Sequence, residues 1–149
     1  MDCRFEEDRS KEQLEIIIKK ASYDKEVADL LHYLELFSEI TPNVIPVKTE
    51  DRIVLLKVED LILVDVDGTQ LILETMTGTL RTNDRLYKFK ERLKNPNFVQ
   101  VSKQSLININ HLNYLEASFS GNMTARLDKN IRTIVSRRYL KELEARLGL

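Results

Sequence analysis

The sequence predicts a mostly β fold with short helices, preceded by an N-terminal α-helical arm. Apolar residues recur at helical spacing through the first part of the chain, and Pro42 and Pro46 then end that pattern. Beyond the prolines, the apolar residues alternate or form short blocks separated by turn residues, which is typical of β-strands. We therefore divide the chain into an arm at residues 1–45 and a β domain at residues 46–149.

Two amphipathic helices are predicted in the arm. Ser10 followed by Gln13 forms a capping-box pattern that would begin the first helix. Its apolar residues share one face, and they are Leu14, Ile17, Ile18 and Ala21. The second helix is predicted over residues 25–40, with an apolar stripe of its own. Two such helices cannot bury both stripes on each other, so the stripes need either the rest of the chain or a second copy.

Short apolar blocks with strand character follow one another through the β domain. They lie at residues 53–56, 61–64, 71–73, 99–101, 106–109, 112–115, 123–127 and 133–135. Turn residues separate several of them, with Gly68, Gly78 and Gly121 at the expected hairpins. Two helical stretches interrupt the strands, at residues 84–93 and 138–147.

The length and composition are those of a globular protein. The chain has 149 residues, of which 42% are hydrophobic and 32% are charged, so it is too apolar for disorder and too charged for a membrane protein. The start lacks the basic and apolar regions of a secretory signal, and the single cysteine, Cys3, cannot close an internal disulfide. We therefore expect a cytoplasmic protein, and the sequence assigns no role to Cys3.

The charge is distributed unevenly along the chain. Residues 1–45 hold 6 Lys and Arg against 11 Asp and Glu, whereas residues 46–149 hold 17 against 13, which together give the net charge of -1. A basic domain behind an acidic arm is a composition that suits a polyanion binder, because binding depends on the local surface charge. A solvated charged face explains the same counts, so charge alone leaves both interpretations open.

The sequence does not contain the residue pattern of an enzyme. His32 and His111 are not at metal-ligand spacing from another ligand, and His111 is interpreted as a turn residue. Asp65 and Asp67 alternate on one face of a strand, but a hairpin end beside Gly68 explains them. With 4 glycines in the chain there is no glycine-rich phosphate loop. We therefore expect no catalysis, no metal, no cofactor and no small-molecule substrate.

Two segments carry side chains suited to nucleic acid. Ser102, Lys103 and Gln104 interrupt an apolar strand with donors and acceptors that match phosphates and base edges. Arg137 and Arg138 follow another apolar strand and open a predicted helix, where one guanidinium can fork onto guanine while the other holds a phosphate. A capped helix with solvated arginines is the structural alternative for the second segment.

The order of these segments resembles the LytTR family of bacterial DNA-binding domains. The resemblance rests on four stretches, which are LILVDVDG from Leu61, LRT from Leu80 with the short helix after it, FVQVSKQSLININHL from Phe98, and VSRRYL from Val135. Each stretch is a weak signal by itself, but their combination and order are specific. The resemblance covers residues 46–149.

Membership of this family implies an elongated, mostly antiparallel β fold whose loops enter successive major grooves of promoter DNA. The base-contacting positions of the family fall on the Gly68 turn, on the Ser102 loop and on the arginine pair. The implied DNA-binding residues are Thr69, Gln70, Ser102, Lys103, Gln104, Arg137 and Arg138. Lys103 and Arg138 are the principal candidates, while Leu106, Ile107 and Asn108 are expected to hold the loop from within the fold.

The resulting functional prediction is a sequence-specific transcriptional regulator of bacterial promoters. The arm is too short for a phosphoacceptor receiver, so the chain is similar to stand-alone LytTR regulators, which are often encoded beside a small membrane protein that restrains them. The arm is predicted to form a homodimer that spaces two DNA half-sites, or else to pack on its own β domain. The competing interpretation is a protein-interaction module whose basic face docks an acidic protein partner.

Overall fold

The chain forms two units in a computed structural model that describes residues 1–38 and 42–149. The first unit comprises Met1–Ile40 and the second Thr41–Leu149. Strand β1 of the second unit begins at Val44, before the division that the sequence suggested between residues 45 and 46. Each unit is described by itself below.

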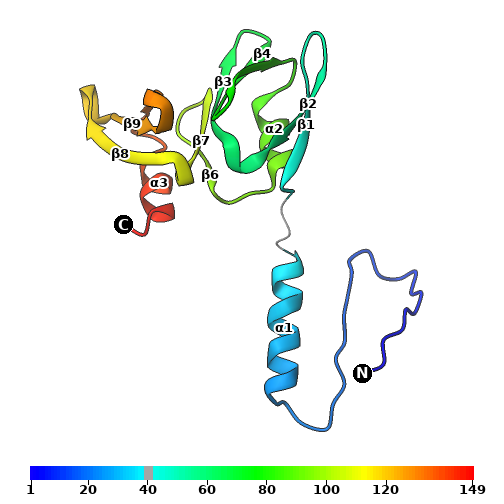
Figure 1. The fold of residues 1–149 in the computed structure, drawn as a ribbon. Coiled ribbons are helices and arrows are strands. Elements are labelled where there is room, and N and C mark those ends of the chain that lie inside the picture. The colour runs from blue at the N-terminus through cyan, green and yellow to red at the C-terminus, as the bar shows by residue number, and fades with distance from the viewer. Residues whose placement is uncertain (39–41) are drawn as a thin grey trace. The chain divides into compact units, whose positions relative to one another are not determined.

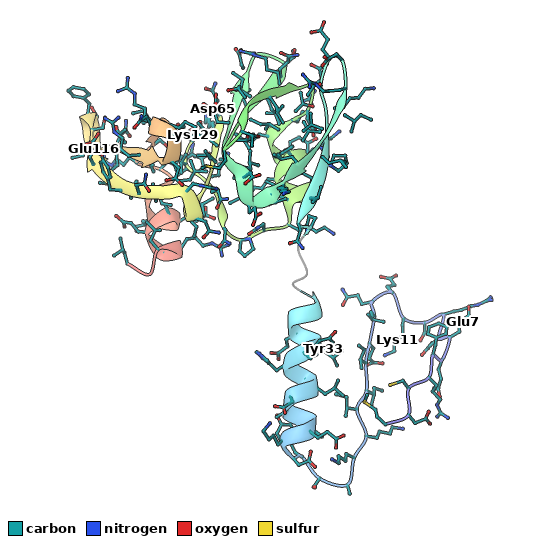
Figure 2. The ribbon with its side chains drawn as sticks, viewed as in Figure 1. Glu7, Lys11, Tyr33, Asp65, Glu116 and Lys129 are labelled. Atoms are coloured by element: carbon teal, nitrogen blue, oxygen red, sulfur yellow. The ribbon has the colours of Figure 1, made fainter. Side chains whose placement is uncertain are left out.

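Within residues 1–38, the first unit contains one helix, α1 (Lys25–Ser38). Its start is set by Asp24, whose Oδ1 accepts a hydrogen bond from the backbone N–H of Val27 at 3.2 Å. Tyr33, labelled in Figure 2, is exposed on this helix. The predicted end of the helix, at residues 39 and 40, lies outside the described residues.

The prediction of a first helix from Ser10 was wrong. The Ser10 hydroxyl donates to Asp8 Oδ1 at 2.6 Å, so it is engaged in a local turn and does not cap a helix. The residues that follow include three consecutive isoleucines at 16–18, whose branched side chains disfavour helix. Leu14 is 84% exposed and Ile17 is 69% exposed, so no packing compensates for the cost of nucleating a short helix.

The second unit is built almost entirely from antiparallel strands (Figure 1). The strands are β1 (Val44–Lys48), β2 (Ile53–Lys57), β3 (Leu61–Asp67), β4 (Gln70–Thr75), β5 (Gly78–Thr82), β6 (Phe98–Gln100), β7 (Ser105–Asn108), β8 (Leu112–Ala117), β9 (Met123–Leu127) and β10 (Arg132–Val135). The helices are α2 (Leu86–Leu93) and α3 (Leu140–Arg146), with short 3₁₀ turns η1 (Val58–Asp60), η2 (Ile109–His111), η3 (Phe119–Gly121) and η4 (Asp128–Asn130). The predicted mostly β fold class is confirmed.

Three sheets result from the strand pairing. A five-stranded sheet has the order β5-β4-β3-β7-β6, a three-stranded sheet has the order β10-β9-β8, and β1 and β2 form a separate hairpin. In the five-stranded sheet, Asp67 is paired with Gln70, Leu71 with Thr82, and Asp65 with Ser105. This register places the β3–β4 turn, the C-terminal end of β5 and the β6–β7 loop at the same end of the strands, along one edge of the sheet and not on one of its faces.

Two hydrophobic cores lie on the two faces of the five-stranded sheet. One core includes Leu61 and Val64 of β3 together with residues of α2 and of the β1–β2 hairpin. The other includes Ile62 and Leu63 of β3 together with residues of β9, β10 and α3. Figure 1 shows α2 beside the hairpin and α3 beside the three-stranded sheet. Because β3 is covered on both faces, its first four residues form an unbroken apolar run.

Two strands were absent from the sequence-based prediction. Residues 41–46 were interpreted as a short linker because of Pro42 and Pro46, but β1 begins at Val44. Pro46 is paired with Leu55 in the two-stranded hairpin, where β1 has one neighbour and tolerates proline. Strand β5 has little apolar character in its sequence Gly-Thr-Leu-Arg-Thr. Its pairing with β4 is fixed by the turn at Gly78, whose φ of 142° is accessible to glycine.

Candidate nucleic-acid interface

The predicted binding segments are joined by backbone hydrogen bonds along one side of the sheets. The N–H of Val66 in β3 donates to the carbonyl of Gln104 at 2.9 Å, and the N–H of Ser136 donates to the carbonyl of Val101 at 2.8 Å. Side-chain bonds add two further junctions, because Gln70 bonds to Asn83 and Asn122 bonds to the N–H of Arg137. We call the resulting series of five junctions the loop row, which comprises residues 68–69, 83–85, 101–104, 118–122 and 136–139. The structure thus brings together all three segments that the sequence singled out.

The β3–β4 turn presents Thr69 to solvent. Gly68 has a φ of 62°, a left-handed conformation that glycine adopts without strain, and Thr69 beside it is exposed. Gln70 is half-buried, and its Nε2 donates to Asn83 Oδ1 at 3.1 Å. Gln70 therefore ties the β3–β4 turn to the start of the segment before α2, and its side-chain oxygen remains available as an acceptor.

The β6–β7 loop exposes Lys103 at its tip. Ser102 Oγ accepts from the N–H of Gln104 at 3.2 Å, and Gln100 Nε2 donates to the carbonyl of Ser102 at 2.9 Å. These bonds fix the backbone of the loop around Lys103, whose side chain is exposed and makes no ion pair among the described residues. Ser102 is thus a loop-forming residue as well as a candidate contact.

The arginine pair lies on a turn that precedes α3. The helix begins at Leu140, so the expectation that Arg137 and Arg138 open it was wrong. A bond from the N–H of Tyr139 to the carbonyl of Ser136, 2.9 Å long, forms this turn, and Tyr139 supplies no side-chain cap. Both arginines are exposed, and neither guanidinium forms an ion pair within the described part of the chain.

The charge balance around the loop row favours anions, because the carboxylates of Asp84 within it and of Asp67 beside it are already engaged. Asp67 pairs with Arg81 at 2.9 Å, and Asp84 accepts from Arg92 at 3.2 Å. On the neighbouring strand β8, Glu116 pairs with Arg126 at 2.7 Å. The exposed cations of the described loop row that lack an ion pair are Arg85, Lys103, Arg137 and Arg138. Their uncompensated charge creates a positive potential along this side of the sheets.

Two residues that hold the loop row were missed by the sequence analysis. Asp65 was attributed to the hairpin end, but its Oδ1 accepts a hydrogen bond from the hydroxyl of Ser105, which anchors the base of the β6–β7 loop. Only a hairpin turn at Gly121 was predicted from the sequence, but its neighbour Asn122 has an Oδ1 that accepts the backbone N–H of Arg137 at 2.9 Å. Asp65 and Glu116, both labelled in Figure 2, lie on two different sheets. The contacts of Asp65 and Asn122 are with residues distant in sequence, so no local signal identifies them.

His111 lies on the opposite side of the sheets from the loop row. Its Nδ1 lies 2.7 Å from Asp128 Oδ2, and its Nε2 lies 2.6 Å from the carbonyl oxygen of Glu59. The hydrogen bond with His111 lowers the pKa of the Asp128 carboxyl below its ordinary value. Within residues 1–38 and 42–149, three or more His, Cys, Asp or Glu side chains nowhere gather into a possible metal site. None of the helices in these residues is long and apolar enough to cross a membrane.

These features define a class of protein, namely a β-sheet domain that presents basic loops in a row along one side of its sheets. The chain matches the model of the LytTr DNA-binding domain over residues 51–148, and it belongs to this family. The family expected from the sequence is therefore confirmed.

Longer regulators are among the relatives of this chain. It is 26% identical over 109 residues to the sensory transduction protein LytR of Staphylococcus saprophyticus, covering 73% of this chain and 43% of that protein. It is 25% identical over 145 residues to the sensory transduction protein LytT of Bacillus anthracis, covering 97% of this chain and 58% of that protein. The chain thus spans about half the length of these relatives.

A solved structure shares the fold. The LytTr DNA-binding domain of a response regulator from Bacillus cereus matches 72% of this chain and 99% of that chain, with a TM-score of 0.66 and 18% sequence identity. The agreement of this fold with the mostly antiparallel sheets described above supports the assignment of the second unit as the LytTR domain.

Proposed function

We propose that this protein is a sequence-specific transcriptional regulator that reads promoter DNA in the major groove through the loops of the loop row. The observation that carries the proposal is the placement of Lys103 and Arg138 on adjacent junctions, because Ser136 is bonded directly to Val101. Both cations are exposed and lack ion pairs in the described structure. Such side chains form bidentate or charge-assisted contacts with guanine and phosphate.

The proposed roles follow from how each side chain is held. Lys103 and Arg138 are exposed and reach base edges, while Arg137, whose backbone is fixed by Asn122, binds a phosphate or a base. Thr69 is exposed on the β3–β4 turn and adds a base contact there. Gln70 and Ser102 each use a side-chain polar group in a bond within the fold, and Gln104 is bonded through its backbone N–H and carbonyl, so we assign these three residues secondary contacts.

We further propose that two copies bind paired half-sites. The apolar stripe of α1 is only partly covered, and its members are Val27, Leu30, Leu31 and Leu34. A second copy would bury this stripe and set two DNA-binding domains about one or two helical turns apart on the duplex. Exchange of subunits between tagged and untagged chains tests this assembly, and a monomer mass at micromolar concentration would contradict it.

The experiment that tests DNA recognition begins with selection of bound duplexes from a random pool. The enriched sequence and a scrambled control are then titrated by fluorescence at two salt concentrations. We expect an enriched motif, much tighter binding to it than to the control, and weakening with salt as counterions are released. Arg138→Ala should weaken binding by about 1–3 kcal/mol and relax base preference at one position.

A matched control distinguishes the effect of a cation in the loop row from the effect of positive charge elsewhere on the domain. Arg132 is exposed at the opposite end of β10 and makes no ion pair among the described residues, so Arg132→Ala removes the same charge away from the loop row. We expect this variant to bind like the unmodified protein. No enriched motif, or equal losses from Arg132→Ala and Arg138→Ala, would favour instead the docking of an acidic protein partner.

A further inference from the structure

The β8–β9 turn carries an exposed aromatic ring at one end of the loop row. Phe119 is 88% exposed, the highest exposed fraction of any large apolar side chain in the described residues 42–149. Single exposed apolar residues are common on protein surfaces and need no function. Phe119 differs from such residues because it lies on a hydrogen-bonded turn directly beside Arg137.

The turn holds a defined conformation. The N–H of Ser118 donates to the carbonyl of Asn122 at 2.9 Å, and the N–H of Asn122 donates to the carbonyl of Phe119 at 3.1 Å. Ser120 has a φ of 58°, a left-handed conformation that is unfavourable for a residue other than glycine. These two bonds fix the backbone from which the exposed ring projects into solvent.

The turn lies directly beside Arg137. Asn122 Oδ1 accepts the N–H of Arg137 at 2.9 Å, and a Cβ added to Gly121 would lie 3.2 Å from Arg137 Cδ. Ser136, at the end of β10, bonds to Val101 of the β6–β7 loop, and β9 and β8 follow β10 in the three-stranded sheet. Arg137 therefore lies between the β6–β7 loop and the β8–β9 turn. Phe119 therefore stands at the outer end of the loop row, past the arginine pair.

The apolar ring of Phe119 in the turn and the guanidinium of Arg137 beside it, which forms no ion pair among the described residues, belong to neighbouring segments. Glu116, the carboxylate of strand β8 that lies nearest in sequence to the turn, is engaged by Arg126 at 2.7 Å and 2.8 Å. A DNA duplex has the matching chemistry, because phosphates alternate with the apolar faces of deoxyribose along its backbone, and thymine methyl groups lie beside them in the major groove. An acidic protein surface offers the charge without this regular apolar component.

We propose that the β8–β9 turn is a further DNA-contacting element, in which the ring of Phe119 packs on the apolar surface of the duplex beside the group bound by Arg137. This inference rests on the proposed function, because it requires DNA to lie along the loop row. Since the turn lies beyond Arg137 and Arg138, the contact extends recognition to base pairs that flank those read by the arginines.

Affinity and salt dependence together test the proposal. We expect Phe119→Ala to raise the Kd for the selected duplex about 3- to 10-fold, because the apolar contact is lost. The dependence of log K on log salt should stay unchanged, because no charge is removed, whereas Arg137→Ala should reduce its slope by about one. Phe119→Tyr, which keeps the ring, should bind like the unmodified protein.

Tyr114 supplies the matched control. It is 56% exposed on strand β8, which leads into the turn that carries Phe119, but it lies away from the loop row, so Tyr114→Ala should leave the Kd unchanged. Hydroxyl-radical footprinting adds a readout that a general loss of stability does not mimic. Phe119→Ala should lose protection only at the nucleotides that flank the core of the site, and the thermal unfolding midpoint should not change.

The outcomes separate the inference from the proposed function. Equal affinity and equal footprints for Phe119→Ala and the unmodified protein would overturn the inference while leaving DNA recognition intact. Failure of the unmodified protein to select any DNA would overturn the proposed function itself. Where the alanine variant is weakened, replacement of flanking thymines by deoxyuridine identifies the contact: a loss of affinity indicates the methyl group, and no loss indicates deoxyribose.

Discussion

Asn122 Oδ1 accepts the backbone N–H of Arg137 at 2.9 Å and so joins the β8–β9 turn to the arginine pair. The bond fixes the backbone that carries the guanidinium, which lowers the entropy lost when Arg137 binds a ligand. Asn122 is half-buried and has no charge, so its effect on DNA is through position. This relationship gives the first of four predictions.

Asn122→Ala should weaken binding of the selected duplex about 2- to 10-fold, because one positioning hydrogen bond is lost. Fluorescence titration measures the effect, and the salt dependence should stay unchanged. Asn110 is an exposed asparagine in η2, on the opposite side of the sheets, so Asn110→Ala serves as the matched control. Similar affinities for the two variants would show that the bond to Arg137 does not position the arginine.

Gly121→Ala should both strain the turn and displace Arg137. Gly121 has a φ of 78°, which costs roughly 1 kcal/mol for a residue with a Cβ, and the new methyl group would lie 3.2 Å from Arg137 Cδ. Gly148 has a similar φ of 81° but no heavy atom within 4 Å of an added Cβ. We expect both variants to lose stability in urea titrations, and only Gly121→Ala to lose DNA affinity. Unchanged binding by Gly121→Ala would contradict a role of this contact in positioning Arg137.

Asn108→Ala should destabilise the fold without changing any DNA contact directly. Asn108 is 2% exposed, its Nδ2 donates to the carbonyl of Leu61 at 2.9 Å, and its Oδ1 accepts the N–H of Asn110 at 3.0 Å. The substitution leaves both partners without their bond, so we expect a loss of about 1–3 kcal/mol in the free energy of unfolding. Urea denaturation measures this loss. A change below about 0.5 kcal/mol would show that water replaces the amide.

Local patterns predicted those parts of the fold and site that depend on neighbouring residues. The turn at Gly68 and the buried strand β3 were found because glycine and an unbroken apolar run are signals within a few positions. Asn108 was expected to be a buried structural amide, and its burial confirms this. The cations of the loop row were found because charge clusters are visible in the sequence.

Other features depend on contacts between distant segments and were missed for that reason. Asp65 and Ser105 are 40 positions apart, and their bond follows only from the pairing of β3 with β7. Pro46 was interpreted as part of a linker that ends the helical pattern, although it lies in strand β1, at an edge position that is set by tertiary structure. Conversely, the helix expected from Ser10 had a capping-box pattern and an apolar stripe, but the exposed Leu14 and Ile17 show that the stripe is not packed. Local sequence propensity therefore failed to predict the structure at positions where tertiary packing decides which element forms.

The bond between His111 and Asp128 should make stability depend on pH in the acid range. His111 Nδ1 lies 2.7 Å from Asp128 Oδ2, and this contact lowers the pKa of the Asp128 carboxyl below its ordinary value of 3.8, with a further contribution from Asn113. The folded state favours ionised Asp128 more than the unfolded state does. The hydrogen bond with His111 therefore contributes its full stabilisation at pH values above the ordinary pKa of the carboxyl. The contribution is lost as the pH falls through the lowered pKa.

Asp128→Asn should therefore be less stable than the unmodified protein at pH 5, and the difference should shrink as the pH falls below about 4. Urea denaturation at a series of pH values measures the free energy of unfolding of each protein. Asp60→Asn is the control, because Asp60 lies in the neighbouring turn η1, whereas the two ring nitrogens of His111 contact Asp128 Oδ2 and the carbonyl oxygen of Glu59. A difference between Asp128→Asn and the unmodified protein that stays constant down to pH 2 would contradict the lowered pKa, since protonation of Asp128 would then cost the folded state nothing.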